Sequence, residues 1–169
     1  NSFHANLKVS SNAGLRFCIK VARMNAPLST DQQSTLARAE RQAQVVQALL
    51  KVLPAHAVLY TTEDTVPYEC DGLTAYRARP MCVALPETYA QVQGVLKACH
   101  ALNVPVVARG AGTGLSGGAM PHTEGVTLSL AKFNKILNID PVARTAVVQC
   151  GVRNLAISEA VAHLGLYYA

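Results

Sequence analysis

Apolar residues between positions 29 and 54 recur at about the 3.6-residue period of an amphipathic helix. The apolar stripe consists of Leu36, Ala43, Val46, Leu50 and Leu53. Ser29, Thr30 and Asp31 are candidate N-cap residues, and Pro54 predicts the end of the helix. We therefore expect one packing helix here, with polar residues on the face opposite the stripe.

A strand, a helix and a second strand are predicted between residues 81 and 108. The apolar runs 81–85 and 104–108 each predict a buried strand. Between them, residues 87–102 predict a helix that places Tyr89, Val92, Leu96 and Cys99 on one face. A βαβ unit of this size implies a right-handed crossover between two parallel strands.

The remaining segments complete an α+β pattern. Residues 61–80 are polar, contain Pro67 and Gly72, and predict a connecting loop. Residues 126–130, 136–139 and 145–149 predict three further strands. Residues 153–163 predict a helix that Gly165 ends. We expect a small parallel βαβ unit followed by more strands and a helix, with a helical extension before it.

Charge and composition exclude several classes of protein. Half of the 169 residues are hydrophobic, which is enough for a packed core. No apolar run approaches the roughly 18 residues of a membrane-spanning helix. The net charge of +5 comes mostly from residues 1–23, because residues 24–169 hold eleven basic and ten acidic residues. We therefore expect no transmembrane segment and no basic surface for nucleic acid.

Residues 1–23 predict a segment without chemistry of its own. They contain no acidic residue and no compact apolar stretch of the signal-peptide kind. They could be a disordered leader that resembles an organellar transit peptide, or translated sequence upstream of a start at Met24. The expected organisation is this leader, then a helix and loop over residues 24–80, then a domain over residues 81–169.

The cysteines favour free thiols in a reducing compartment. Their number is odd, their spacing is wide and no CxxC pair is present. Neither a disulfide framework nor a zinc site has this pattern. We expect a cytoplasmic protein without a metal site, in which the thiols are Cys18, Cys70, Cys82, Cys99 and Cys150.

Five glycines lie within residues 109–119, directly after the second predicted strand. Glycine tolerates positive φ and lets another molecule approach the backbone closely. Successive N–H groups in such a bend form a concave nest that binds anions, phosphate above all. Arg109 adds charge, and Thr113 and Ser116 add hydroxyl donors. The pattern predicts phosphate binding by this loop, whose glycines are Gly110, Gly112, Gly114, Gly117 and Gly118.

Residues 112–117 also match the GxGxxG fingerprint of Rossmann folds, and Asp140 follows about 20 residues later. That fold requires a helix to open at the third glycine. Residues 118–125 instead contain Pro121 and show no helical period, so we expect no Rossmann fold. No lysine follows the glycines, which excludes a Walker loop.

The order of these motifs resembles the FAD-binding domain of the vanillyl-alcohol-oxidase/p-cresol-methylhydroxylase (PCMH) flavoprotein superfamily. Within it, residues 68–73, 109–119 and 152–157 are similar to the FAD-linked D subunits of bacterial glycolate oxidases. The resemblance covers residues 61–169 and implies the first half of a PCMH-type domain. The second FAD segment and a substrate domain are expected after Ala169, so we expect this chain by itself to bind FAD weakly or not at all and to show no turnover.

The resemblance also implies the cofactor and its contacts. The FAD diphosphate would lie across the amides of residues 109–118, Ala111 included, with further backbone contacts near Gly151 and Val152. The superfamily's covalent histidine position holds Thr113, which implies dissociable FAD. Related proteins have Pro or Ala where this chain has Cys150.

The implied activity is oxidation of a 2-hydroxy acid, glycolate to glyoxylate first, with hydride passing to the flavin. Electrons would leave through other subunits of a complex, including an iron–sulfur subunit. Two alternatives stay open: a D-lactate or D-2-hydroxyglutarate dehydrogenase on the same fold, and a non-catalytic truncated nucleotide-binding fragment. The catalytic residues cannot be assigned from this sequence.

Overall fold

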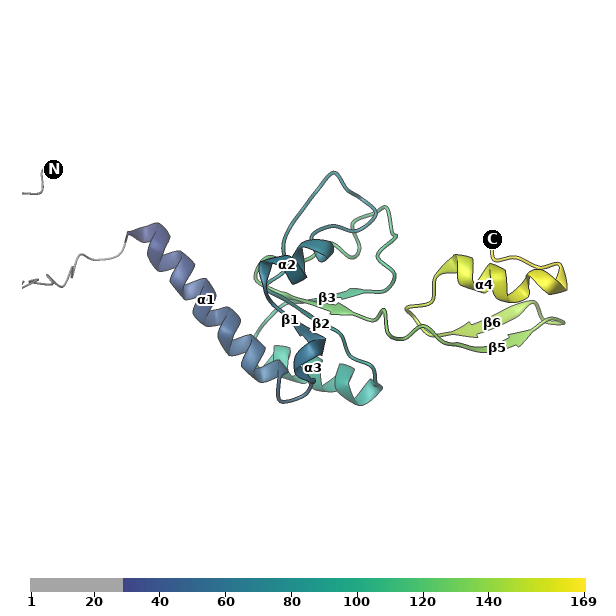
Figure 1. Cartoon of the computed structure of the whole chain (residues 1–169), viewed down its shortest axis with the longest axis horizontal. Helices are drawn as coiled ribbons and strands as arrows, with labels where there is room; N and C mark the ends of the chain where they lie inside the picture. The colour runs from purple at the N-terminus through teal and green to yellow at the C-terminus, as the bar shows by residue number, and fades with distance from the viewer. Residues whose placement is uncertain (1–28) are drawn as a thin grey trace, which may run out of the picture.

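A computed structural model of the chain describes residues 29–169, and the predicted leader lies outside them. Helices and a small sheet form one end of the molecule, and a hairpin with a short helix forms the other (Figure 1). The expected combination of α and β structure is confirmed. Among the described residues, no helix is both long and apolar enough to cross a membrane.

Helix α1 (Thr30–Leu49) begins with a capping box at Ser29, whose Oγ accepts from the backbone N–H of Gln32 at 3.3 Å. Its second half is buried at Val45, Val46 and Leu49. The prediction that the helix continues to Pro54 is wrong, because the chain turns after Leu49. The predicted stripe residue Leu36 is also exposed, since the first half of the helix extends beyond the sheet (Figure 1).

The sheet has the strand order β1-β2-β4-β3. Strand β1 (Val58–Leu59) pairs antiparallel with β2 (Cys82–Ala84). Strand β4 (Val126–Ser129) pairs parallel with both β2 and β3 (Val106–Arg109). The predicted parallel arrangement of β2 and β3 is therefore confirmed, but β4 lies between them. This central place explains why all four residues of β4 are buried.

Helix α3 (Tyr89–Ala101) connects β2 to β3 and buries part of the predicted face, since Cys99 is buried and Val92 packs against the core. Its capping box joins Thr88 and Gln91. Val95 and Cys99 are buried, whereas Tyr89 and Leu96 are exposed. The error at Tyr89 arose because this residue is the first of the helix and contacts Phe133 instead, with ring centroids 5.4 Å apart.

The segment predicted as a polar loop over residues 61–80 is more structured than expected. Helix α2 (Thr62–Thr65) has Thr61 as its N-cap, and the 3-10 turn η2 (Val66–Tyr68) follows. The side chain of Asp71 is buried. Short polar residues at caps and turns satisfy backbone groups locally, so a polar composition did not mean an unstructured segment.

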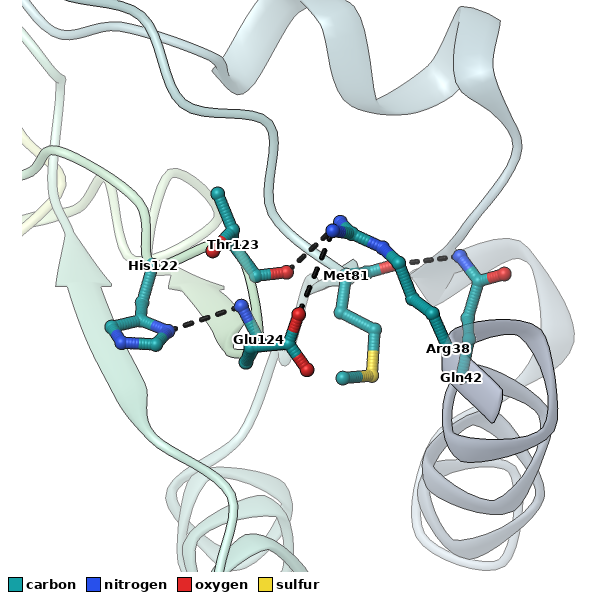
Figure 2. A network of polar contacts seen from close by, with 6 residues as sticks. All are labelled: Arg38, Gln42, Met81, His122, Thr123 and Glu124. Carbon is teal, nitrogen blue, oxygen red and sulfur yellow. Dashed lines mark hydrogen bonds and ion pairs between the residues drawn. The ribbon is translucent and has the colours of Figure 1, made fainter. Parts of the chain in front are cut away.

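Polar side chains of α1 hold the beginnings of the parallel strands (Figure 2). Arg38 donates to the Thr123 carbonyl at 3.0 Å and pairs with Glu124 at 3.6 Å, just before β4. Gln42 donates to the Met81 carbonyl at 2.7 Å, just before β2. The opposite, carboxyl ends of these strands lead to the glycine-rich loop, where open parallel sheets usually bind ligands.

The other end of the molecule is a hairpin covered by a helix. Strands β5 (Ile136–Asp140) and β6 (Thr145–Val148) pair antiparallel. Helix α4 (Asn154–Val161) continues into the 3-10 turn η3 (Ala162–Leu164), and Gly165 ends it with φ +69°. Buried Phe133 lies in the connection from β4 to β5. The predicted strands, helix and C-cap of this region are confirmed, with ends that differ by one or two residues.

Candidate functional site

The glycine-rich loop leaves the carboxyl end of β3 without forming a helix. Gly112 and Gly117 have φ of +72° and +75°, in the left-handed region that favours glycine. Residues 110–120 contain only bends and a turn. The prediction that no helix opens at Gly117 is therefore confirmed, and the GxGxxG match does not indicate a Rossmann fold.

The backbone amides of this loop have no partners within the described chain. No N–H group from Gly110 through Gly118 donates to another described residue. The N–H donors that are used come directly afterwards, where Ala119 donates to Asp71 and Met120 to the Gly117 carbonyl. Polar backbone groups need partners, so a row of free N–H donors suits an anion supplied from outside.

Two of the glycines face open space. A Cβ at Gly114 or Gly118 would meet no heavy atom within 4 Å. The side chains of Thr113 and Ser116 are exposed and form no hydrogen bond within the described chain. Both hydroxyl groups and both open glycines are therefore accessible to a ligand that approaches the loop.

A cavity of about 510 Å³ lies beside the start of the loop. It brings together two segments that the sequence analysis singled out separately, Arg109–Gly110–Ala111 and Gly151–Val152. Its lining contains no carboxylate and two arginines, which makes the cavity positively charged. The remaining lining residues are Pro67, Tyr68, Ser129, Ala131, Asn134, Arg153 and Ala156.

Gly151 and Val152 form a wall of this cavity, but their amides are already used. The Gly151 N–H donates to the Phe133 carbonyl at 2.9 Å, and the Val152 N–H donates to the Gln149 carbonyl at 3.1 Å. A Cβ at Gly151 would lie 2.2 Å from the Leu130 carbonyl oxygen. The structure therefore requires glycine at 151 because the chain passes close to the β4–β5 connection.

Cys150 lies where the two segments that line the cavity meet. Its carbonyl oxygen would lie 2.9 Å from a Cβ at Gly110, so the two backbones approach closely there. Its side chain is exposed and contributes nothing to that contact. The close approach of the two backbones therefore does not depend on the side chain at position 150.

The Arg109 guanidinium lies against the glycine loop at Gly112 and is also held by the segment around Tyr68. Its Nη1 donates to the Cys70 carbonyl at 2.6 Å, and its guanidinium lies over the Tyr68 ring, 5.5 Å from the centroid. A Cβ at Gly112 would lie 2.5 Å from its Nη2. Arg109 thus connects the segment around Tyr68 to the loop, and the loop can fold over it because residue 112 is glycine.

The structural role of residues 68–73 was not predicted from the sequence. Asp71 is buried and accepts from the N–H groups of Leu73 at 2.9 Å and Ala119 at 3.3 Å. A Cβ at Gly72 would lie 2.7 Å from the Gly114 carbonyl oxygen. The segment therefore supports the glycine loop from behind. Its motif was visible in the sequence, but its burial against a loop far along the chain was not.

Two of the described cysteines, Cys82 and Cys99, are buried thiols. Among the residues that the structure describes, no three His, Cys, Asp or Glu side chains form a group that could hold a metal ion. Burial, and secondarily the nearby Cys99, raises the pKa of Cys82 to about 12. Burial also raises the pKa of Cys99. Both thiols therefore stay protonated at neutral pH.

Comparison with known proteins identifies a family and several relatives of this chain. The sequence profile of the FAD binding domain family matches residues 80–169, which is more than half of the chain. Glycolate oxidase subunit GlcD of Escherichia coli K12 is 58% identical over 125 residues, covering 74% of this chain and 25% of the relative. D-2-hydroxyglutarate dehydrogenase of Xanthomonas citri pv. viticola is 34% identical over 123 residues, covering 73% and 26%. The chain thus spans about a quarter of the length of these relatives.

The fold also matches a solved flavoprotein. The crystal structure of p-cresol methylhydroxylase with substrate bound superposes with a TM-score of 0.63 at 30% identity, covering 75% of this chain and 25% of that one. This confirms the expected PCMH-type fold. With the profile match over residues 80–169, it shows that the chain belongs to the FAD binding domain family.

Proposed function

We propose that this chain forms the diphosphate-binding part of a flavin-dependent 2-hydroxy-acid oxidoreductase. The observation that carries the proposal is the row of free N–H donors from Gly110 through Gly118, beside a cavity without carboxylates. A diphosphate has the charge and the acceptor oxygens that such a nest binds. Membership of the FAD binding domain family identifies FAD as the ligand that fits.

The residues divide into three roles toward FAD. The amides of the loop and the two free hydroxyls would bind the diphosphate, through Gly110, Ala111, Gly112, Thr113, Gly114, Ser116, Gly117 and Gly118. Gly151 and Val152 would border the ligand as a wall. Arg109 would hold the loop in shape. Bound FAD would supply a hydride acceptor, and no residue of this chain is proposed to be catalytic.

The proposed reaction is the oxidation of glycolate to glyoxylate. Its support is the 58% identity with a glycolate oxidase subunit over most of this chain. Oxidation of D-2-hydroxyglutarate is the second candidate, supported by the 34% identity with that dehydrogenase. Both reactions remove hydride from the carbon that carries a hydroxyl beside a carboxylate, and both leave the role of the loop unchanged.

The proposed partners rest on the same relative, and the proposed location rests on the cysteines. A glycolate oxidase subunit works with other subunits, and we propose that an iron–sulfur subunit is among them. We also propose a cytoplasmic location, supported by the free thiols of Cys70, Cys82, Cys99 and Cys150.

FAD is proposed to be held without a covalent bond. The supporting residue is Thr113, whose hydroxyl is a poor nucleophile compared with an imidazole nitrogen. Acid precipitation of the flavin-loaded protein should release yellow flavin into the supernatant. Flavin that remains with the pellet would contradict this proposal.

The activity is tested on the natural gene product that carries this sequence. The purified protein should show flavin absorbance, and anaerobic glycolate should bleach it faster than D-lactate or D-2-hydroxyglutarate. Faster bleaching by D-2-hydroxyglutarate would favour the second candidate. A protein without flavin, or with flavin that none of the three acids reduces, would contradict the proposed function.

A further inference from the structure

Two arginines line the cavity beside the glycine loop, and the structure uses them differently. Arg109 is engaged by the Cys70 carbonyl and the Tyr68 ring. Arg153 lines the same cavity. Its side chain is exposed, forms no ion pair or hydrogen bond within the described chain, and does not cap the helix that it precedes. Arg153 is therefore the arginine of this cavity whose side chain has no partner within the described chain.

The backbone fixes the place of Arg153 beside the cavity. The preceding Gly151 and Val152 are held by their hydrogen bonds to Phe133 and Gln149. Its own carbonyl accepts from the N–H of Ala156 at 3.0 Å, at the start of α4. Only the side chain is unconstrained. Its substitution should therefore change the charge of the cavity and leave the fold intact.

We infer that Arg153 binds the anionic diphosphate of the dinucleotide, a role that the sequence pattern had assigned to Arg109. This inference rests on the proposed function. A guanidinium can donate two parallel hydrogen bonds to phosphate oxygens, and no carboxylate in the cavity lining competes for it. The loop amides and Arg153 would then approach the diphosphate from the two segments that meet at the cavity.

The test compares four forms of the natural gene product that carries this sequence: wild type, R153Q, R153K and R79Q. Arg79 is an exposed arginine that does not line the cavity, so R79Q is the matched control. Binding of FAD and of inorganic pyrophosphate is followed through the amide signals of ¹⁵N-labelled protein, which also detect weak affinity. Spectra without ligand establish that each variant is folded.

R153Q should bind both ligands about tenfold more weakly or worse, the usual effect of losing a hydrogen bond to a charged group. R153K should keep more of the affinity because it keeps the charge, and R79Q should match wild type. Added salt should weaken binding to wild type more than binding to R153Q. If R153Q is unfolded, R153K and the salt dependence of wild type decide the question.

The inference would be overturned if R153Q bound both ligands as tightly as wild type, or if R79Q lost as much affinity as R153Q. If R153Q is unfolded, the other measurements decide. The inference is then overturned if R153K binds as tightly as wild type and added salt does not change the affinity of wild type. A wild-type gene product that binds neither FAD nor pyrophosphate would instead overturn the proposed function, so the two failures are distinguishable.

Discussion

The carboxylate of Asp71 accepts a hydrogen bond from the backbone N–H of Ala119, 48 residues later in the chain, at 3.3 Å. Its other oxygen accepts from the N–H of Leu73 at 2.9 Å. Because each oxygen has its own donor, this buried side chain joins the segment 68–73 to the end of the glycine loop. The shape of the loop thus depends on a residue outside it.

Asp71→Asn should destabilise the protein, because an amide offers one acceptor oxygen where the structure needs two. Its NH₂ group would face an N–H donor. We expect a loss of about 1–3 kcal/mol in the free energy of unfolding, the cost of an unsatisfied buried group. The measurement is denaturant unfolding followed by circular dichroism.

Asp140→Asn is the matched control for that experiment. A single oxygen of Asp140, Oδ1, accepts from both Val142 at 2.9 Å and Ala143 at 2.8 Å, and asparagine keeps such an oxygen. D140N should therefore unfold close to wild type. Equal losses for D71N and D140N would show that the second oxygen of Asp71 contributes nothing.

Gly112→Val should distort the glycine loop. Its φ of +72° disfavours a β-branched residue, and a Cβ would lie 2.5 Å from Nη2 of Arg109. We expect a loss of FAD affinity of about tenfold or more, since the strain of about 1–2 kcal/mol falls on the segment that binds the diphosphate. Titration of FAD into the folded variant measures this.

Gly165→Val is the control that introduces a similar backbone strain outside the glycine loop. Gly165 has a φ of +69° with open space around it, and it lies after α4, away from the glycine loop. This variant should lose stability but bind FAD as wild type does. A G112V variant with unchanged FAD affinity would remove the loop from the binding site.

The buried thiols predict a decline of stability in alkaline solution. Cys82 has a pKa of about 12 in the folded protein, raised from 9.0. Below pH 9 both states keep the proton. Between pH 9 and 12 the unfolded state loses it first, so folding stability should fall as the pH rises. Cys82→Ala should weaken this decline in pH-dependent denaturant unfolding. If the stability of C82A declined as steeply with pH, Cys82 would not be the cause of the decline.

Local patterns in the sequence predicted the elements better than their arrangement. The glycine run after an apolar strand was sufficient to predict a loop with free amides, because close backbone approach depends on local residue type. The insertion of β4 between β2 and β3 could not be predicted in the same way, since all three strands are short and apolar.

The direction of individual side chains was the least predictable part of the site. Arg109 follows β3 directly, and nothing in the sequence near it shows that the Cys70 carbonyl lies within its reach. The burial of Asp71 likewise depends on a loop distant in sequence. Arg153 becomes notable only once the structure shows that the cavity contains no carboxylate.

The most direct test of the account is an FAD titration of the flavin-free, ¹⁵N-labelled gene product that carries this sequence, read residue by residue. We predict that the amide signals of residues 110–118 shift together and progressively, with further shifts near Gly151 and Val152. Signals of the hairpin turn around Val142 should stay unchanged. Shifts confined to other segments, or no shift at any FAD concentration, would contradict the claim that this loop binds the diphosphate.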